Sequence, residues 1–182
     1  MKLPIAYYGS SSLRKKTKKV LEITEDTQKL IDDMIETMCS LDGLGIAAPQ
    51  VFREEAIFIT RVPEQLPDGK WVDGKIRAYI NPKILSYSAE VQQWEEGCLS
   101  IPGLYLMVPR PSRILVEAMD RNGNVFQEEL QGFFACNFCH ENDHLNGVLH
   151  IDRTDPETKN RIKSELKKIK EKYSTVTAQN SD

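Results

Sequence analysis

The arrangement of the histidines limits what this chain can fold into more than any other feature does. All three histidines lie within eleven consecutive residues, at His140, His144 and His150. Residues 140–144 read HENDH, which fits the pattern H-E-x-x-H. Residues four apart lie on the same face of an α-helix, so two imidazoles at this spacing can reach one cation. We therefore expect a helix over residues 132–146, one face of which holds a metal ion.

Length and composition are those of an ordinary globular protein. The chain has 182 residues, 40% of them hydrophobic and 28% charged, and a formal net charge of −3. This balance predicts one folded domain over residues 1–182 and argues against disorder and against DNA binding. The sequence contains neither an apolar run of ~18 residues nor an N-terminal export signal. We expect a cytoplasmic monomer that does not enter membranes and whose four cysteines stay reduced.

Two more helices are predicted, one on each side of a group of strands. The spacing of apolar residues over 24–41 predicts an amphipathic helix with Thr24 as its cap, and Gly43 after its end can adopt a left-handed conformation. A basic helix with a narrow apolar stripe is predicted over about 156–173. The polar tail at 174–182 is expected to fray.

Short apolar runs between these helices predict strands that pair through turns. We expect strands over residues 55–61, 77–81, 83–88, 113–118 and 125–130, a polar loop over 63–75, and a tight turn at Asn122-Gly123. The connections are too short for repeated helical crossovers, so the pairing should be antiparallel. The predicted fold class is α+β, with antiparallel sheets around a central helix that carries H-E-x-x-H and with helices near both ends.

A longer motif that includes all three histidines is typical of one class of metalloprotease. Residues 140–150 also fit the metzincin protease pattern, in which His150 is the third metal ligand beside His140 and His144. That family needs a methionine turn downstream, and no methionine follows His150. A metzincin-type metalloendopeptidase is therefore the weaker alternative.

Three other interpretations of residues 136–144 involve no metalloenzyme. Cys136 and Cys139 followed by His140 form C-x-x-C-H, the string that attaches haem covalently in proteins exported from the cytoplasm. This function would remove His140 from the H-E-x-x-H site, so the two interpretations exclude each other. A redox role for C-x-x-C requires a preceding thioredoxin-like strand, which the sequence does not predict. The simplest alternative is a helix whose two histidines make ordinary buried hydrogen bonds.

A third metal ligand of another type is available upstream. Residues 96–100 read EGCLS and place Cys98 in a glycine-flanked, strand-like segment. A thiolate binds zinc or ferrous iron strongly and would complete a Cys/His/His set with one position open for water. The residues alone predict a divalent ion that prefers thiolate and imidazole ligands.

Three strings together resemble the signatures of the peptide deformylases, in that family's order and spacing. They are GLGIAAPQ (43–50), EGCLS (96–100) and HENDHLNG (140–147), and the likeness extends from about Leu13 to Arg153. The family removes the formyl group from N-terminal formylmethionine of nascent polypeptides and releases formate. The resemblance implies the same reaction here, with Fe²⁺ as the metal and Zn²⁺ or Ni²⁺ able to replace it.

The resemblance also implies roles for particular residues. Cys98, His140 and His144 would bind the metal, and Glu141 would act as general base and then as general acid. The backbone N–H of Leu99 and the side-chain amide of Gln50 would bind the oxyanion. Gly45 and Gly97 would let an extended peptide approach the backbone closely. The apolar pocket for the methionine side chain would be formed by Leu44, Trp94, Phe133 and Cys136.

Some positions depart from the family pattern or extend it. Cys139, His150 and Tyr105 differ from the residues more usual in the family, and we interpret His150 as structural. In some bacterial members a C-terminal helix docks on the ribosome, and the basic helix over 156–173 would suit RNA phosphates. The alternative for this helix is a solvated face held by its apolar stripe.

Overall fold

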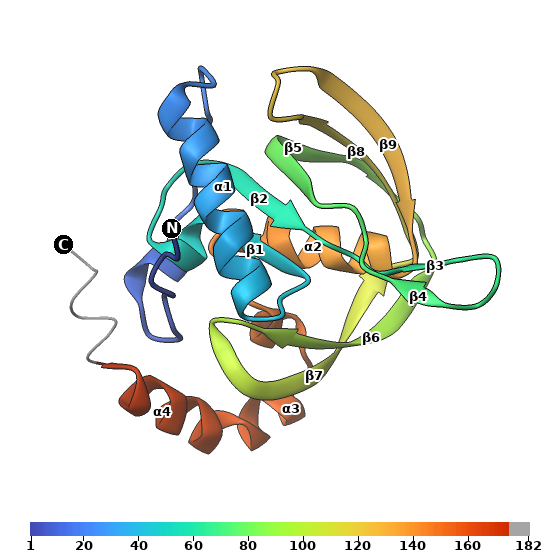
Figure 1. Ribbon diagram of the computed structural model, residues 1–182. Helices are drawn as coiled ribbons and strands as arrows, with labels where there is room; N and C mark the ends of the chain where they lie inside the picture. The colour runs from blue at the N-terminus through green and yellow to red at the C-terminus, as the bar shows by residue number, and fades with distance from the viewer. Residues whose placement is uncertain (175–182) are drawn as a thin grey trace.

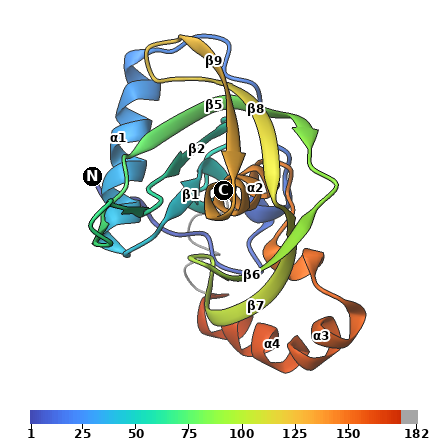
Figure 2. The ribbon, with the colours of Figure 1, turned by 90° about the vertical axis from the view of Figure 1, so that its right-hand side faces the viewer.

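The helix that carries the histidines lies at the centre of the molecule. The computed structural model describes residues 1–174, and helix α2 (Phe133–Leu145) crosses its middle (Figure 1). The sheets lie around α2, whereas α1 (Glu25–Ser40) and the pair α3 (Pro156–Arg161) and α4 (Lys163–Lys172) lie at the periphery (Figure 2). The predicted α+β class, with antiparallel sheets around a central helix, is confirmed.

The larger sheet separates α1 from α2. Its five antiparallel strands follow the order β1 (Gly45–Ala47), β2 (Ile57–Thr60), β5 (Arg77–Tyr87), β8 (Arg113–Met119) and β9 (Val125–Gln131). Every residue of β2 is buried. Because side chains alternate along a strand, Ile57 and Ile59 pack with α1, whereas Phe58 packs with Phe138 of α2. This packing explains the unbroken apolar run that identifies the strand in the sequence.

A separate hairpin of two long strands forms the opposite side of the molecule. It consists of β6 (Val91–Cys98) and β7 (Ile101–Pro111). Alternate residues of β7 are buried, namely Leu104, Leu106, Val108 and Arg110. The sequence analysis did not predict these strands beyond the segment around Cys98, because β7 contains three prolines, Pro102, Pro109 and Pro111, which weaken any strand signal.

Strand β5 is longer than expected. It replaces the two strands predicted over 77–81 and 83–88, and the ladder shifts register between Ile80 and Lys83. Asn81 lies at this irregularity with a left-handed φ of 51°, and its side-chain amide bonds both the N–H and the C=O of Val20 at 2.8 Å. The polar loop over 63–75 contains a small hairpin of β3 (Glu64–Gln65) and β4 (Trp71–Val72).

Helix α1 begins as predicted and ends slightly differently. The Thr24 side chain accepts a hydrogen bond from the backbone N–H of Thr27, which confirms its capping role. After the helix it is Asp42, with a φ of 51°, that adopts the left-handed conformation, and not Gly43. The space beside Gly43 is filled instead by the Leu99 side chain, so the absence of a side chain at position 43 serves close packing.

The predicted C-terminal helix is divided into α3 and α4. The two helices meet at Ile162, whose side chain is buried in the same apolar cluster as Leu104 and Leu166. Most of the predicted frayed tail, residues 175–182, lies outside the described residues. Short 3₁₀ helices complete the fold: η1 (Ser11–Arg14), η2 (Ala48–Val51) and η3 (His150–Arg153). Within residues 1–174, no helix combines the length and apolarity that crossing a bilayer requires.

Candidate metal centre and active site

Helix α2 places its two histidines one turn apart. The ring centroids of His140 and His144 lie 5.0 Å apart, and both side chains are buried. The helix ends in a left-handed turn at Gly147, where the N–H of Val148 bonds the C=O of Asp143 at 3.0 Å. A Cβ at Gly147 would also lie only 2.6 Å from the Arg14 carbonyl oxygen. A glycine is therefore needed three residues after the second histidine to end this buried helix.

Cys98 completes a cluster of three potential metal ligands. It is the last residue of β6, after the register shift that follows Glu96, and its Sγ lies 3.4 Å from Nε2 of His144. Donor atoms of Cys98, His140 and His144 all lie within 4.8 Å of one another. No other such cluster occurs among residues 1–174. One thiolate and two imidazoles at this separation suit Zn²⁺ or Fe²⁺ better than Mg²⁺ or Ca²⁺, which prefer oxygen ligands.

A carboxylate behind the cluster orients the first histidine. Glu96 Oε2 lies 2.8 Å from Nδ1 of His140, so the other ring nitrogen is directed away from Glu96. Burial alone would raise the pKa of Glu96, but hydrogen bonds from His140 and Arg110 outweigh it and hold the pKa well below its usual value. Burial likewise opposes a charge on His140, and hydrogen bonds with Cys98 and Glu96 still raise its pKa well above the ordinary value. A carboxylate of this kind fixes the orientation of a ligating imidazole.

Arg110 extends this contact into a buried network of charges. Its guanidinium donates to both oxygens of Glu96, at 2.7 and 3.0 Å, and to Asp143 at 2.7 Å. Asp143 also accepts two hydrogen bonds from Arg153. This network was not predicted from the sequence, although Arg110 has the same parity in β7 as the buried Leu104, Leu106 and Val108. An arginine at an inward position of an alternating strand was the signal that could have revealed it.

Glu141 lies beside the cluster, in the space next to Gly45. Its side chain is almost fully buried, and its Oε2 has no hydrogen-bond partner among the described residues. Burial raises the pKa of Glu141 to about 7, although the nearby positive charge of His140 acts in the opposite direction. A Cβ at Gly45 would overlap the carboxylate of Glu141. The missing side chain at position 45 therefore makes room for a carboxylate that can both accept and release a proton near neutral pH.

Gln50 is held with its amide N–H₂ group toward Cys98. Its Oε1 accepts a hydrogen bond from the N–H of Ala47 at 2.8 Å, which fixes the orientation of the amide. Its Nε2 lies 3.2 Å from Ser100 Oγ and 3.6 Å from Cys98 Sγ. Leu99 lies in the turn between β6 and β7 and lines the same cavity as Gln50. The two expected oxyanion donors therefore lie on the same side of the cluster as the thiol.

The cluster opens into a cavity of about 610 Å³. Leu44, Gly45, Gly97, Phe133 and Cys136, all expected to contact substrate, line it. Trp94 does not belong to the lining; it packs behind Phe133, with ring centroids 5.4 Å apart. The sequence places Trp94 and Phe133 equally well in an apolar wall, and only the register of β6 shows which ring reaches the cavity.

His150 does not join the ligand cluster. Its ring centroid lies 5.8 Å from that of His140, and neither ring nitrogen makes a hydrogen bond of normal geometry among residues 1–174; the Leu104 backbone is a polar contact of the ring. Burial lowers the pKa of His150 to about 4, and the positive charge of His140 acts in the same direction. The metzincin ligand set is therefore not assembled, and Cys98 takes the place that His150 would have.

The interpretation of C-x-x-C-H as a haem-attachment site is not supported, because its two cysteines are buried. Cys136 and Cys139 are both buried, and all four cysteines of the chain are unpaired thiols. Burial raises the pKa of Cys139 to about 12, and Cys136 donates a hydrogen bond to Glu96. Cys139 packs in the apolar core with Phe138, so the two thiols of the motif are not both open to covalent attachment.

Comparison with known proteins agrees with this site. Residues 2–160 match the family model described as polypeptide deformylase. The chain belongs to the polypeptide deformylase family. A peptide deformylase of Fusobacterium nucleatum is 38% identical over 178 residues, which cover 97% of each chain. The family identification made from the three sequence strings is confirmed, and the chain is an enzyme of this metal-dependent family.

Solved deformylase structures share the fold. A crystal structure of peptide deformylase from Ehrlichia chaffeensis has a TM-score of 0.85 and 35% identity, and covers 96% of this chain and 99% of that chain. A second structure of the Ehrlichia deformylase, in complex with actinonin, has a TM-score of 0.84 and 36% identity, with 94% and 97% covered. The deformylase family match ends before α4, so the last helix lies outside the region that the family model describes.

Proposed function

We propose that this enzyme hydrolyses the formyl group from N-formylmethionyl peptides and releases formate. The observation that carries the proposal is the convergence of Cys98, His140 and His144 beside Glu141 at a cavity, in a chain of the deformylase family. The metzincin alternative is not favoured, because His150 lies outside the ligand group. We further propose that residues 1–182 form a single catalytic domain.

The expected metal is ferrous iron, with zinc or nickel able to replace it. The donor set fits such an ion, because Cys98 offers a thiolate and each histidine offers a ring nitrogen within the same small volume. When bound, a divalent ion supplies positive charge that lowers the pKa of a water molecule and polarises the formyl oxygen. Glu96 supports this function, since it orients His140 without itself reaching the cluster of donor atoms.

Glu141 is the residue that would move protons. Its unpartnered oxygen can accept a proton from the attacking water and then deliver it to the departing amine nitrogen. A pKa of about 7 suits both steps, because each form of the carboxyl group is accessible at neutral pH. Substituting the residue should therefore remove nearly all turnover while the three ligands remain.

Gln50 and Leu99 would stabilise the negative oxygen that forms during attack. The Gln50 amide is oriented by Ala47 and presents its N–H₂ group toward Cys98 without adding a charge. The backbone N–H of Leu99 would be the second donor, from the turn beside Cys98. Removal of one donor of this kind typically costs about 3 kcal/mol of transition-state stabilisation.

The cavity suits an extended peptide. Strand β1 pairs only with β2 and strand β6 only with β7 within the described residues, and Gly45 of β1 and Gly97 of β6 line the cavity. Strand edges can add a peptide strand, and glycines let its backbone come close. Leu44, Phe133 and Cys136 would contact the methionine side chain. The deformylase–actinonin complex of Ehrlichia supports a ligand site in this fold.

A direct assay tests the proposal. Protein purified without oxygen should contain one divalent metal ion per chain and should release formate from formyl-Met-Ala. Internal cleavage of casein would support the endopeptidase instead, and a haem absorption band would support an electron carrier. The variant Gln50→Ala should retain the metal and lose about a hundredfold or more of kcat. A wild-type enzyme that contains metal and releases no formate would contradict the proposal.

We also propose that the enzyme is a cytoplasmic monomer whose C-terminal helix contacts the ribosome. The exposed side of α4 carries Lys163, Lys167, Lys168, Lys170 and Lys172. Its buried Leu166 holds the helix on the body of the protein, with these lysines on the solvent side, where they could meet RNA phosphates. The enzyme should sediment with ribosomes at low salt and separate from them at high salt. Absence of sedimentation at low salt would contradict this contact.

A further inference from the structure

Helix α4 brings a residue distant in sequence to the cavity. Ile162, Leu166 and Ile169 pack in one apolar cluster with Ala6 and Leu104. The helix therefore lies beneath both the N-terminal segment and the β6–β7 hairpin (Figures 1 and 2). Tyr173, the residue that caps the C-terminal end of α4, reaches the cavity and is part of the cavity lining.

Tyr173 stacks on a second tyrosine of the lining. The rings of Tyr7 and Tyr173 lie 3.8 Å apart at their centroids, and their planes differ by 17°. Both side chains are half-buried and both line the cavity that contains Glu141. The two ends of the described chain thus form one aromatic element of the cavity wall, which we call the tyrosine pair.

Backbone hydrogen bonds fix Tyr7 of this pair relative to the reaction centre. The N–H of Ala6 bonds the C=O of Gln50 at 2.8 Å, and the N–H of Tyr8 bonds the C=O of Ser100 at 2.8 Å. Tyr7 therefore sits between two anchors, one to the expected oxyanion donor and one to the turn after Cys98. A wall held in this way can discriminate between ligands, because its position does not depend on a mobile loop.

We infer that the tyrosine pair is a subsite for an apolar or aromatic side chain of the peptide after the formylmethionine. The inference rests on the proposed deformylation and deepens it. Extended residues advance by about 3.3 Å each, so the second to fourth residues of a substrate lie within about 10 Å of the first. Phe133 and Cys136 account for the methionine pocket, and the tyrosine pair is a separate part of the lining.

The tyrosine pair suits an apolar or aromatic side chain because of the ring surface that it offers. The Tyr173 ring already has the Tyr7 ring stacked on it and Lys172 Nζ 5.2 Å from its centre. An apolar or aromatic side chain gains contact area and edge-to-face packing against these rings. Tyr173 lies beyond residue 160, where the deformylase family match ends.

The test measures how the second to fourth residues of the substrate affect binding. The substrates are formyl-Met-Ala and formyl-Met-Ala-Ala-Ala, the latter also with Phe at position two, three or four. In wild-type enzyme, Phe at one of these positions should give a lower KM than Ala at the same position. Tyr173→Ala should raise the ratio of the Phe-peptide KM to the all-Ala KM about fivefold, with little change in kcat. Tyr173→Phe should restore the wild-type ratio, because the ring is retained.

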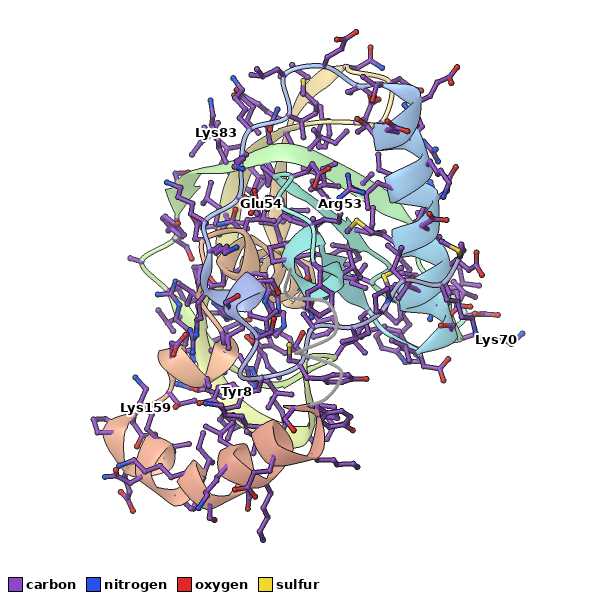
Figure 3. All side chains as sticks on the ribbon, turned by 90° about the vertical axis from the view of Figure 1, so that its left-hand side faces the viewer. Tyr8, Arg53, Glu54, Lys70, Lys83 and Lys159 are labelled. Atoms are coloured by element: carbon purple, nitrogen blue, oxygen red, sulfur yellow. The ribbon has the colours of Figure 1, made fainter. Side chains whose placement is uncertain are left out.

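Matched variants separate this effect from a loss of structure. Tyr8 lies next to the C-terminal helices (Figure 3) and does not line the cavity, so Tyr8→Ala should leave the Phe-to-Ala ratio unchanged. Tyr7→Leu should raise the ratio of the Phe-peptide KM to the all-Ala KM, as Tyr173→Ala does. Calorimetry with the product peptides should give the same order of affinities.

The outcomes distinguish this inference from the function on which it rests. Wild-type enzyme that releases no formate from formyl-Met-Ala contradicts the proposed function. Active wild-type enzyme in which Tyr173→Ala and Tyr7→Leu leave every KM ratio unchanged overturns the tyrosine-pair subsite alone.

Discussion

The helix α2 and the 3₁₀ helix η3 carry histidines that are equally hidden from solvent but differently surrounded. His140 and His144 of α2 face Cys98, and Glu96 holds the ring of His140. His150 of η3 lies against His140, yet neither of its nitrogens makes a hydrogen bond of normal geometry among residues 1–174. All three match a motif in the sequence, and only two converge on a common point.

This difference shows what separates a ligand from a buried histidine. Burial is the same in both regions, and sequence spacing fits both. The distinguishing feature is convergence on Cys98, whose Sγ lies 3.4 Å from Nε2 of His144. Glu96, which is held by Arg110, orients the ring of His140 toward the same point. A motif alone does not reveal these contacts, because Arg110 comes from β7, 30 residues before His140 in the chain.

The largest predicted effect separates the two regions directly. His144→Ala removes a ligand and should leave the protein without stoichiometric metal and without formate release. His150→Ala should retain both, because its ring lies outside the ligand group. Metal analysis of the two variants, purified side by side without oxygen, measures the difference. Metal loss in the His150 variant would revive the metzincin ligand set.

The next effect concerns proton transfer without metal binding. Glu141→Gln keeps the shape of the side chain beside Gly45 but cannot accept a proton. We expect kcat to fall by about 10² to 10⁴, with metal content unchanged. Turnover of formyl-Met-Ala close to the wild-type rate would assign the proton transfer to another group.

A smaller effect is expected for the partner that orients His140. Glu96→Gln should weaken metal affinity by about 10- to 100-fold, since the amide cannot match the charge of Glu96 between His140 and Arg110. Competition with a chelator measures the affinity, and Glu129→Gln on the exposed side of β9 is the control. Equal affinities in the two variants would show that orientation by Glu96 is not needed.

The smallest effect concerns how much stability the buried His150 removes at low pH. The pKa of His150 is lowered to about 4 in the folded protein, so between the unfolded value of 6.5 and pH 4 only the unfolded chain takes up this proton. Stability is therefore lost as the pH falls through this range. Removing this proton uptake in His150→Phe should raise the free energy of unfolding by about 1 kcal/mol at pH 5.5. At pH 8, where neither state takes up the proton, this gain should nearly vanish. Thermal unfolding of wild type and variant with equal metal content, at pH 5.5 and at pH 8, measures this gain. An equal gain at the two pH values would exclude protonation of His150 as the cause.

The sequence predicts the parts of the site that follow from local pattern. The spacing of His140 and His144 predicts the helix, and Gly147 marks its end. The apolar run within 55–61 predicts the strand that forms β2, and EGCLS places a thiol among the expected metal ligands. Each of these features depends on residues close together in the chain, which is why they are visible without a structure.

The remaining parts depend on register and long-range packing. The β6–β7 hairpin is hidden by prolines, and its register decides that Gly97 and not Trp94 lines the cavity. The break between α3 and α4 arises because Ile162 packs into the core, and no proline or glycine marks it. The meeting of Tyr7 with Tyr173 joins residues from opposite ends of the chain, beyond the reach of any periodicity.

The most direct test of the account is the removal of the sulfur of Cys98. Cys98→Ala should abolish both bound metal and formate release from formyl-Met-Ala, because two imidazoles alone leave the ligand set incomplete. Cys39→Ala, a cysteine outside the cluster, should change neither. If metal analysis of anaerobically purified Cys98→Ala gave one ion per chain and a wild-type rate of formate release, the ligand set proposed here would be wrong.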